Sequence, residues 1–169
     1  MADWNKYKSE IKQNLTTLSF GKKVDFALKT SVDLISDYIE FEKNRKWGDS
    51  TILKRGIEIL NEYIRTNEFD LGIVVDTIAE LDEVIPHTDD FGETDGTLAL
   101  NAGAAMHESL AFLVYEQDNG LLDIASYAYH SIETKVWEKN PSLSESEIAN
   151  HKTLVSEMNK VLNRTKNVA

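Results

Sequence analysis

The stretch that decides the fold is Ile85-Pro86-His87-Thr88-Asp89-Asp90-Phe91-Gly92-Glu93-Thr94-Asp95-Gly96, followed by the segment Thr97 to Gln117. Pro86 disfavours helical backbone at the residue before it, so a preceding helix is expected to end at Ile85. Aspartate and glycine are turn-forming residues. We therefore predict a turn region at residues 87–95, called here the acidic elbow, between two helices. Asp95 or Thr97 is expected to cap the second helix.

The segment 97–117 is predicted to be a central helix. Small residues occupy its middle, and large apolar residues surround them. A helix that is apolar on nearly every side is buried, and small residues let its neighbours approach closely. Asn101, His107 and Glu108 interrupt the apolar run, so we do not expect it to span a membrane.

Helical spacing of apolar residues recurs along the rest of the chain. It predicts helices at about 4–18, 22–44, 50–64, 71–85 and 121–138, and a last helix that ends near Leu162. The expected caps are Asp3 for the first helix, Asp49 or Ser50 for the third, and a Ser142/Glu145 or Ser144/Glu147 capping box for the last. With no linker or repeat, the chain is predicted to be an all-α, single-domain bundle (1–169) of about seven helices around the buried central helix, with 163–169 as a frayed tail.

The predicted fourth helix contains the β-branched run Ile73-Val74-Val75, which also fits a short strand. We favour a helix because the helical spacing continues beyond the run. Val74, Val75, Ile78, Leu81 and Ile85 are then expected to face inward. Asp76, Glu80 and Glu83 are expected to face outward.

The net charge of −11 is unevenly distributed. No Lys or Arg lies between Arg65 and Lys135, a segment of 69 residues that holds 15 Asp and Glu. One interpretation is a solvated acidic face that keeps the protein soluble. The other is a surface that attracts a basic partner or a cation. Direct binding of nucleic acid is disfavoured, because phosphates need Lys and Arg. The candidate partner-binding residues are Asp76, Glu80, Glu83, Asp89, Asp90 and Glu93.

Motifs for catalysis or metal binding fail on inspection. The chain has no cysteine, which excludes disulfides and thiolate catalysis. His107-Glu108 begins like a zinc-protease helix, but the second histidine is replaced by Ala111, so His107 is expected to be a core histidine bonded to a neighbour. A loose divalent-cation site at Asp89, Asp90, Glu93 and Asp95 remains an alternative. We expect no catalytic residue, no metal and no cofactor.

Residues 1–10 are charged and lack an apolar core, so no signal peptide is expected and the cytoplasm is the predicted location. No membrane association is expected either.

The motif Ile85-Pro86-x-x-Asp89-Asp90-Phe91 and its companion Trp47-Gly48-Asp49, with Leu53, Arg55 and Ile57, resemble the bacterial family called domain of unknown function 416, the YjaG-like proteins. The small-residue helix and the Asn140-Pro141 break match as well, so the resemblance covers about residues 20–162. It implies an all-helical bacterial cytosolic protein and no assigned activity.

Three functions remain open. The first is a non-catalytic protein-binding protein, in its most defined form a bacterial immunity protein that neutralises a basic toxin, for example a nuclease. Acidity, small size and the lack of a catalytic motif favour it, since opposite charges speed association. The second is a metal-dependent protein that uses the acidic elbow. The third is a housekeeping protein whose acidity only maintains solubility.

Overall fold

The computed structural model describes residues 4–166. Within that range it contains eight α-helices and no strand, which confirms the all-α bundle. The helices are α1 (Trp4–Leu15), α2 (Phe20–Arg45), α3 (Ser50–Thr66), α4 (Leu71–Val84), α5 (Thr94–Tyr115), α6 (Asp118–Lys139), α7 (Glu145–Ala149) and α8 (Lys152–Arg164). None of the described helices is both long and apolar enough to cross a membrane.

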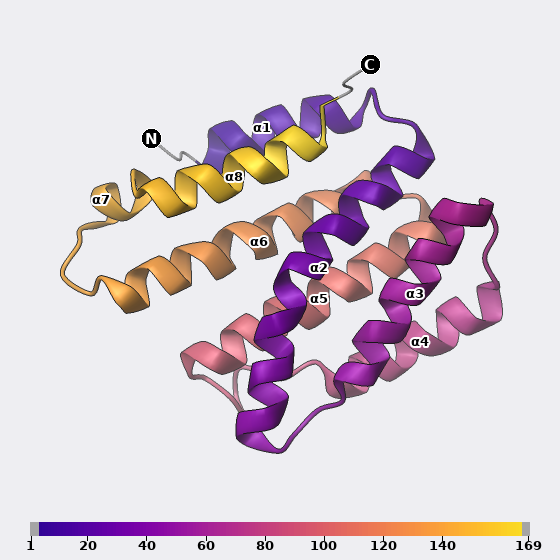
Figure 1. Cartoon of the computed structure of the whole chain (residues 1–169), viewed down its shortest axis with the longest axis horizontal. Coiled ribbons are helices and arrows are strands. Elements are labelled where there is room, and N and C mark those ends of the chain that lie inside the picture. The colour runs from indigo at the N-terminus through magenta and orange to yellow at the C-terminus, as the bar shows by residue number, and fades with distance from the viewer. Residues whose placement is uncertain (1–3, 167–169) are drawn as a thin grey trace.

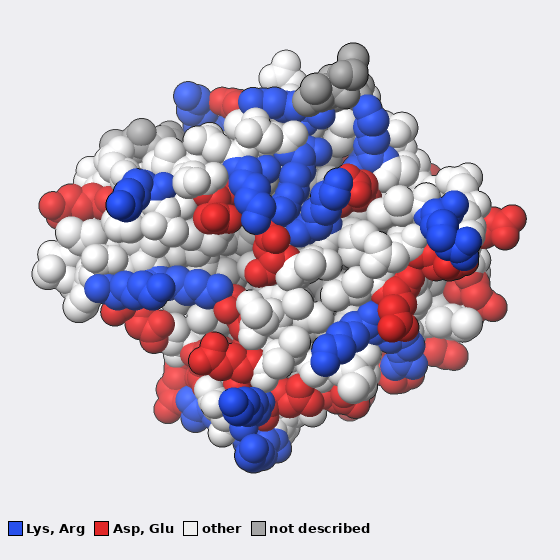
Figure 2. Space-filling model, in the orientation of Figure 1, with Lys and Arg blue, Asp and Glu red and all other residues white. Residues whose placement is uncertain are grey.

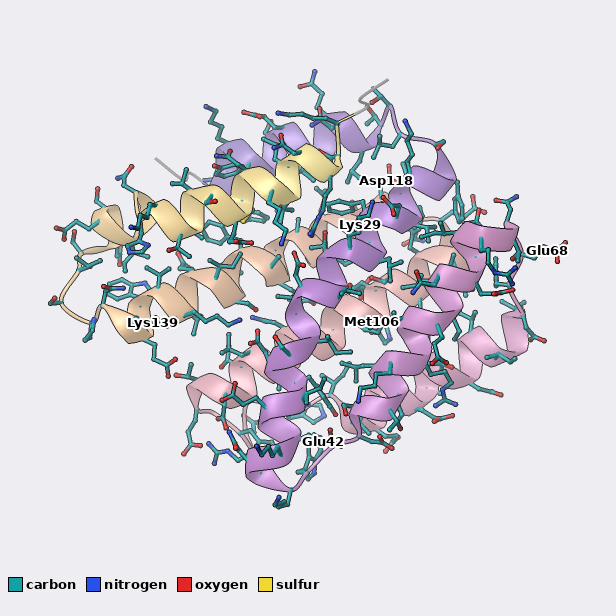
Figure 3. The ribbon with its side chains drawn as sticks, in the orientation of Figure 1. Lys29, Glu42, Glu68, Met106, Asp118 and Lys139 are labelled. Atoms are coloured by element: carbon teal, nitrogen blue, oxygen red, sulfur yellow. The ribbon has the colours of Figure 1, made fainter. Side chains whose placement is uncertain are left out.

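The central helix α5 packs against α2, α3, α4 and α6 (Figure 1). Its small residues lie at these contacts, because Ala99, Ala102 and Ala105 are almost fully buried. At the crossing with α2, the hydroxyl of Ser31 donates to the carbonyl of Ala105 over 3.1 Å. Met106 lies in the interior, where α2, α3 and α5 meet (Figure 3). The prediction of a buried central helix is therefore confirmed.

The other elements form layers on either side of α5. Helix α6 lies between α5 and the pair α1 and α8, while α3 and α4 cover the opposite side (Figure 1). The Tyr7 hydroxyl donates to the Asn159 side-chain oxygen over 3.1 Å and joins α1 to α8.

The boundaries of α5 differ from the predicted 97–117. The helix begins at Thr94, so Glu93 is its N-cap residue instead of Asp95 or Thr97, and the Glu93 side chain makes no capping bond. It ends at Tyr115, because Glu116 adopts a left-handed conformation with φ of 55°. The predicted helices 97–117 and 121–138 leave a break at residues 118–120, but the break lies at Glu116 and Gln117, since α6 starts at Asp118.

The predicted last helix is in fact two helices, α7 and α8. Ser144 and Glu147 form the capping box of α7, so the Ser144/Glu147 alternative was the correct one. The side chain of Asn150 bonds to the Ser146 carbonyl and ends α7, and His151 caps α8. This break explains why the described residues form eight helices where about seven were predicted.

The frayed tail predicted for 163–169 was wrong over residues 163–166. Helix α8 continues to Arg164, whose side chain pairs with Asp33 over 2.8 Å, and Thr165 is fully buried. Residues 167–169 and the predicted cap Asp3 lie outside the described residues.

Candidate protein-binding surface

Helix α4 starts at a side-chain cap, since the Asp70 carboxylate accepts the backbone N–H of Ile73 over 3.1 Å. The run Ile73–Val75 is helical, which confirms helix over strand. Asp76, Glu80 and Glu83 are exposed as predicted. At about 100° per residue they lie within about 60° of one another around the helix axis, on one outward face.

The acidic elbow follows α4 directly. The backbone N–H groups of Asp90 and Phe91 both donate to the His87 carbonyl, over 3.1 and 2.9 Å, and this closes the turn. Asp89 and Asp90 are exposed at its tip. Their carboxylates have no hydrogen bond or ion pair within residues 4–166, so they are available to a partner.

Two aromatic rings hold the acidic elbow against the bundle. The ring of Phe91 lies 5.0 Å from that of Trp47 and 5.1 Å from that of Phe41. Gly96 is needed for the backbone path, because a Cβ there would lie 2.1 Å from the Phe91 carbonyl oxygen. The motif residues Trp47 and Phe91 therefore meet in space and have a structural role.

Arg45 clamps the acidic elbow from the end of α2. Its guanidinium forms two bonds to the Asp95 carboxylate, over 2.7 and 2.8 Å, and a third to Glu93. Glu93 is exposed as predicted, but it already has a cationic partner. A divalent ion would have to compete with Arg45 for both carboxylates. This geometry weakens the alternative of a metal site at the elbow, and residues 4–166 contain no group of three or more carboxylate or histidine ligands placed for a metal.

A second arginine neutralises part of α4. Arg55 of α3 forms an ion pair with Glu80. Of the six candidate residues, Glu80 and Glu93 are thus paired with arginines, whereas no ion pair within residues 4–166 involves Asp76, Glu83, Asp89 or Asp90. Both arginines lie outside the segment that lacks Lys and Arg, so counting charges along the chain could not reveal them.

The charge is unevenly distributed on the face shown in Figure 2. Lys and Arg gather there over α1, α8 and the start of α2, whereas over α3, α4 and the end of α2 many Asp and Glu are interspersed with Lys and Arg. Ion pairs reduce the acidic potential of this side without removing it, because α4 has a formal charge of −4 and α3 has a formal charge of only +1.

The sequence prediction missed an apolar component of this surface. Val75 was predicted to be buried, but 46% of it is exposed; Thr77 is buried instead. Phe69, Leu71 and Ile73 are also exposed, at 38%, 55% and 51%. The sequence did indicate this exposure, because α4 begins with more apolar residues than one helix face can bury.

Part of this apolar surface forms a groove between α3 and the start of α4, with a volume of about 380 Å³. Ile59, Phe69 and Ile73 supply its apolar lining. Glu58, Glu62, Glu68, Asp70 and Arg55 surround them, so the formal charge of the lining is −3. Glu68, at the connection of the two helices, projects away from the body of the molecule (Figure 3).

His107 is half-buried and lies between two carboxylates. Its Nε2 is 3.3 Å from Asp82 and its Nδ1 is 3.5 Å from Glu108. The hydrogen bond of Glu108 raises the pKa of His107, against the effect of burial, and the charge of Asp82 adds to the rise. The expectation of a histidine bonded to a neighbour is confirmed, but His107 is partly exposed and is not a core residue.

Comparison with known families gives a match. A family model described as "Protein of unknown function (DUF416)" matches residues 10–168. The chain is also similar to the crystal structure of a DUF416 family protein from Shewanella baltica OS155, with a TM-score of 0.75 and 16% identity over 90% of this chain and 82% of that one. At this identity the likeness shows the fold alone. No curated protein matches the chain.

Proposed function

Because the chain belongs to the DUF416 family, which has no known function, we propose a function from its own surface: a non-catalytic protein that binds a basic protein partner. The specific form proposed is a bacterial immunity protein that neutralises a basic toxin, for example a nuclease, in the cytoplasm. The partner is a protein; neither nucleic acid nor a membrane is part of the proposal.

One observation carries this proposal: Asp76, Glu83, Asp89 and Asp90 are exposed carboxylates without an ion pair in the described part of the chain. In a chain of net charge −11, they produce a negative potential on the α4 and elbow side. Such a potential accelerates encounter with a basic protein, because electrostatic steering raises association rates by about 10- to 1000-fold.

The test is kinetic. The partner would be identified by cross-linking in cells of the source organism, purified, and its association rate measured with the parent protein and with a Glu80→Lys, Glu83→Lys, Asp90→Lys variant. The rate is expected to fall tenfold or more, and added salt should slow the parent by screening beyond about 8–10 Å. Asp89 stays unchanged so that the elbow keeps part of its charge.

A matched control reverses three acids away from this surface: Glu145 of α7, which is exposed, and Glu10 of α1 and Glu157 of α8, which are partly exposed. It changes the net charge equally, so its association rate should fall much less. Equal association rates at low salt for the parent and for the Glu80→Lys, Glu83→Lys, Asp90→Lys variant would show that the acidic surface serves solubility only. The remaining alternative, a housekeeping protein, would then be favoured.

A further inference from the structure

We propose that the groove between α3 and α4 is the docking site for a short amphipathic helix of the partner, with apolar anchors flanked by Lys or Arg. This inference rests on the proposed function and specifies the chemistry of the partner. It starts from the neighbours of α4: its larger helix–helix contacts are with α3 and α5, and Leu71, Ile73 and Val75 remain exposed.

The apolar lining of the groove comes from two helices and the connection between them. Ile59 is half-buried on α3, Phe69 lies in the connection, and Ile73 is in the first turn of α4. Exposed apolar area that is surrounded by charged residues is typical of a binding site. An apolar side chain inserted here would remove Phe69 and Ile73 from water, which is the main source of affinity in such an interface.

The charged residues that line the groove specify the sign of the charge that the partner must carry. Arg55, Glu58, Ile59 and Glu62 follow the spacing i, i+3, i+4 and i+7, so they lie along one face of α3. Arg55 pairs with Glu80, which does not line the groove, and even with Arg55 counted the formal charge of the lining is −3. Glu62 pairs with Arg65 over 2.5 Å, but both are exposed, and such a pair is weak enough to exchange for a partner's cation. A basic segment is therefore complementary.

The arrangement favours a helix over an extended segment. Glu58, Ile59 and Glu62 are adjacent on α3, so the partner must present cationic and apolar side chains side by side. A helix does this with residues i, i+3 and i+4, whereas a strand sends alternate side chains to opposite faces. Residues 4–166 also offer no sheet edge to which a strand could bond, and a helix satisfies its own backbone groups.

A second copy of the chain fits poorly. A two-fold symmetric contact through this groove would place Glu58, Glu62 and Glu68 opposite their own copies, and like charges repel. The same charges exclude a nucleic acid or an anionic membrane surface as the occupant.

The test uses a synthetic helical peptide of about 18 residues, made of Leu and Lys at i, i+3 and i+4 spacing, because shorter helices are marginal in water. Binding is measured by fluorescence anisotropy, and the site is mapped by amide chemical-shift changes. A peptide of the same composition with alternating Leu and Lys, and one with Glu in place of Lys, serve as controls. Shifts are expected around the groove, at residues 55–76, with the helical peptide alone.

Two matched variants locate the contact. Ile73→Asp is expected to weaken peptide binding tenfold or more. Val75→Asp should change it less than twofold, since Val75 has similar exposure on the same helix but does not line the groove. Both substitutions add negative charge, which favours a basic peptide, so the loss isolates the apolar contact. Circular dichroism tests whether these variants fold. A further variant, Glu58→Lys with Glu62→Lys, should also bind the peptide tenfold more weakly.

Equal effects of the two Asp variants, or chemical shifts outside the groove, would overturn the proposal. So would a dimer in sedimentation that Ile73→Asp dissociates, because a second copy would then be the occupant. The peptide test is independent of the natural partner. If the Glu80→Lys, Glu83→Lys, Asp90→Lys variant binds the partner more slowly and Ile73→Asp does not weaken binding, the groove is not the docking site and the proposed function still stands.

Discussion

The hydroxyl of Tyr38 on α2 donates a 2.6 Å hydrogen bond to the carbonyl of Val84, the last residue of α4. The same oxygen accepts the backbone N–H of Asp49 over 3.2 Å. One fully buried side chain therefore joins α2 to the start of α3 and to the end of α4, just before the acidic elbow. Gly48, with φ of 93°, leaves room for this oxygen, because a Cβ there would lie 2.5 Å from it.

Tyr38→Phe should therefore be destabilising. It leaves the Val84 carbonyl and the Asp49 N–H without their partner, and a buried unsatisfied group costs about 1–3 kcal/mol. We expect a loss of about 2–3 kcal/mol in the free energy of unfolding, measured by urea denaturation. Tyr115→Phe is the control, since Tyr115 is 66% exposed and should change stability by less than about 0.5 kcal/mol. A similar small change for Tyr38→Phe would mean that water replaces the hydroxyl.

Close packing of α5 gives a second prediction. Ala105 is fully buried where α5 meets α2, so Ala105→Leu should overpack this contact and cost about 1–3 kcal/mol. The control is Ala79→Leu on α4, where the alanine is exposed. It should be nearly neutral in the same thermal or urea unfolding measurement. If both variants were neutral, the small residues of α5 would not define the helix spacing.

Local signals in the sequence predicted much of this fold. The spacing of apolar residues located each long helix to within a few residues, because one face of each helix is buried. Asp49 and Ser144 were each one of two predicted caps, since a side-chain oxygen before a helix acts on N–H groups only two or three residues away. Because these interactions join residues that are close together in the sequence, the local sequence pattern predicts them.

The features that the sequence did not predict depend on contacts between residues that are far apart in the chain. The pairing of Glu80 with Arg55, and of Glu93 with Arg45, joins residues 25 and 48 positions apart, which no spacing rule connects. The burial of Thr77 instead of Val75 depends on how α4 rotates against α3 and α5. The groove between α3 and α4 was missed for the same reason, because it exists only when two helices meet.

The N-cap of α3 gives a prediction that depends on acid pH. The Asp49 carboxylate accepts the backbone N–H of Thr51 over 2.9 Å and its hydroxyl over 2.5 Å, and these bonds lower the pKa of Asp49. A carboxyl whose pKa is lower in the folded state contributes stability above its unfolded pKa of about 3.9, and loses it as the pH falls through the folded value.

Asp49→Ala should thus cost about 1 kcal/mol at pH 7, the usual loss for an N-cap, and less at pH 2.5. Urea unfolding at both pH values measures it. Asp90→Ala, at an exposed and unpaired carboxylate, should show neither effect. A constant loss at both pH values would mean that shape, and not the charge, carries the contribution of Asp49.

The last prediction concerns His107, whose imidazole joins α5 to α4 through Asp82 and is flanked by Glu108 on its own helix. Because its pKa is raised on folding, the sign is opposite to that of Asp49. The charged imidazole contributes stability that is fully present below its unfolded pKa of about 6.5 and is lost as the pH rises through the folded value. His107→Gln should therefore destabilise the protein more at pH 5.5 than at pH 9.

Unfolding curves for parent and variant at the two pH values test this, and nuclear magnetic resonance titration of the imidazole gives the direction of the shift directly. His130→Gln is the matched control, since His130 is more exposed and contacts only Glu133 among the carboxylates of the described residues. Asp82→Asn should reproduce part of the loss at pH 5.5 and none at pH 9, because Asp82 acts only on the charged ring. A loss that is the same at both pH values would show that His107 contributes by packing alone.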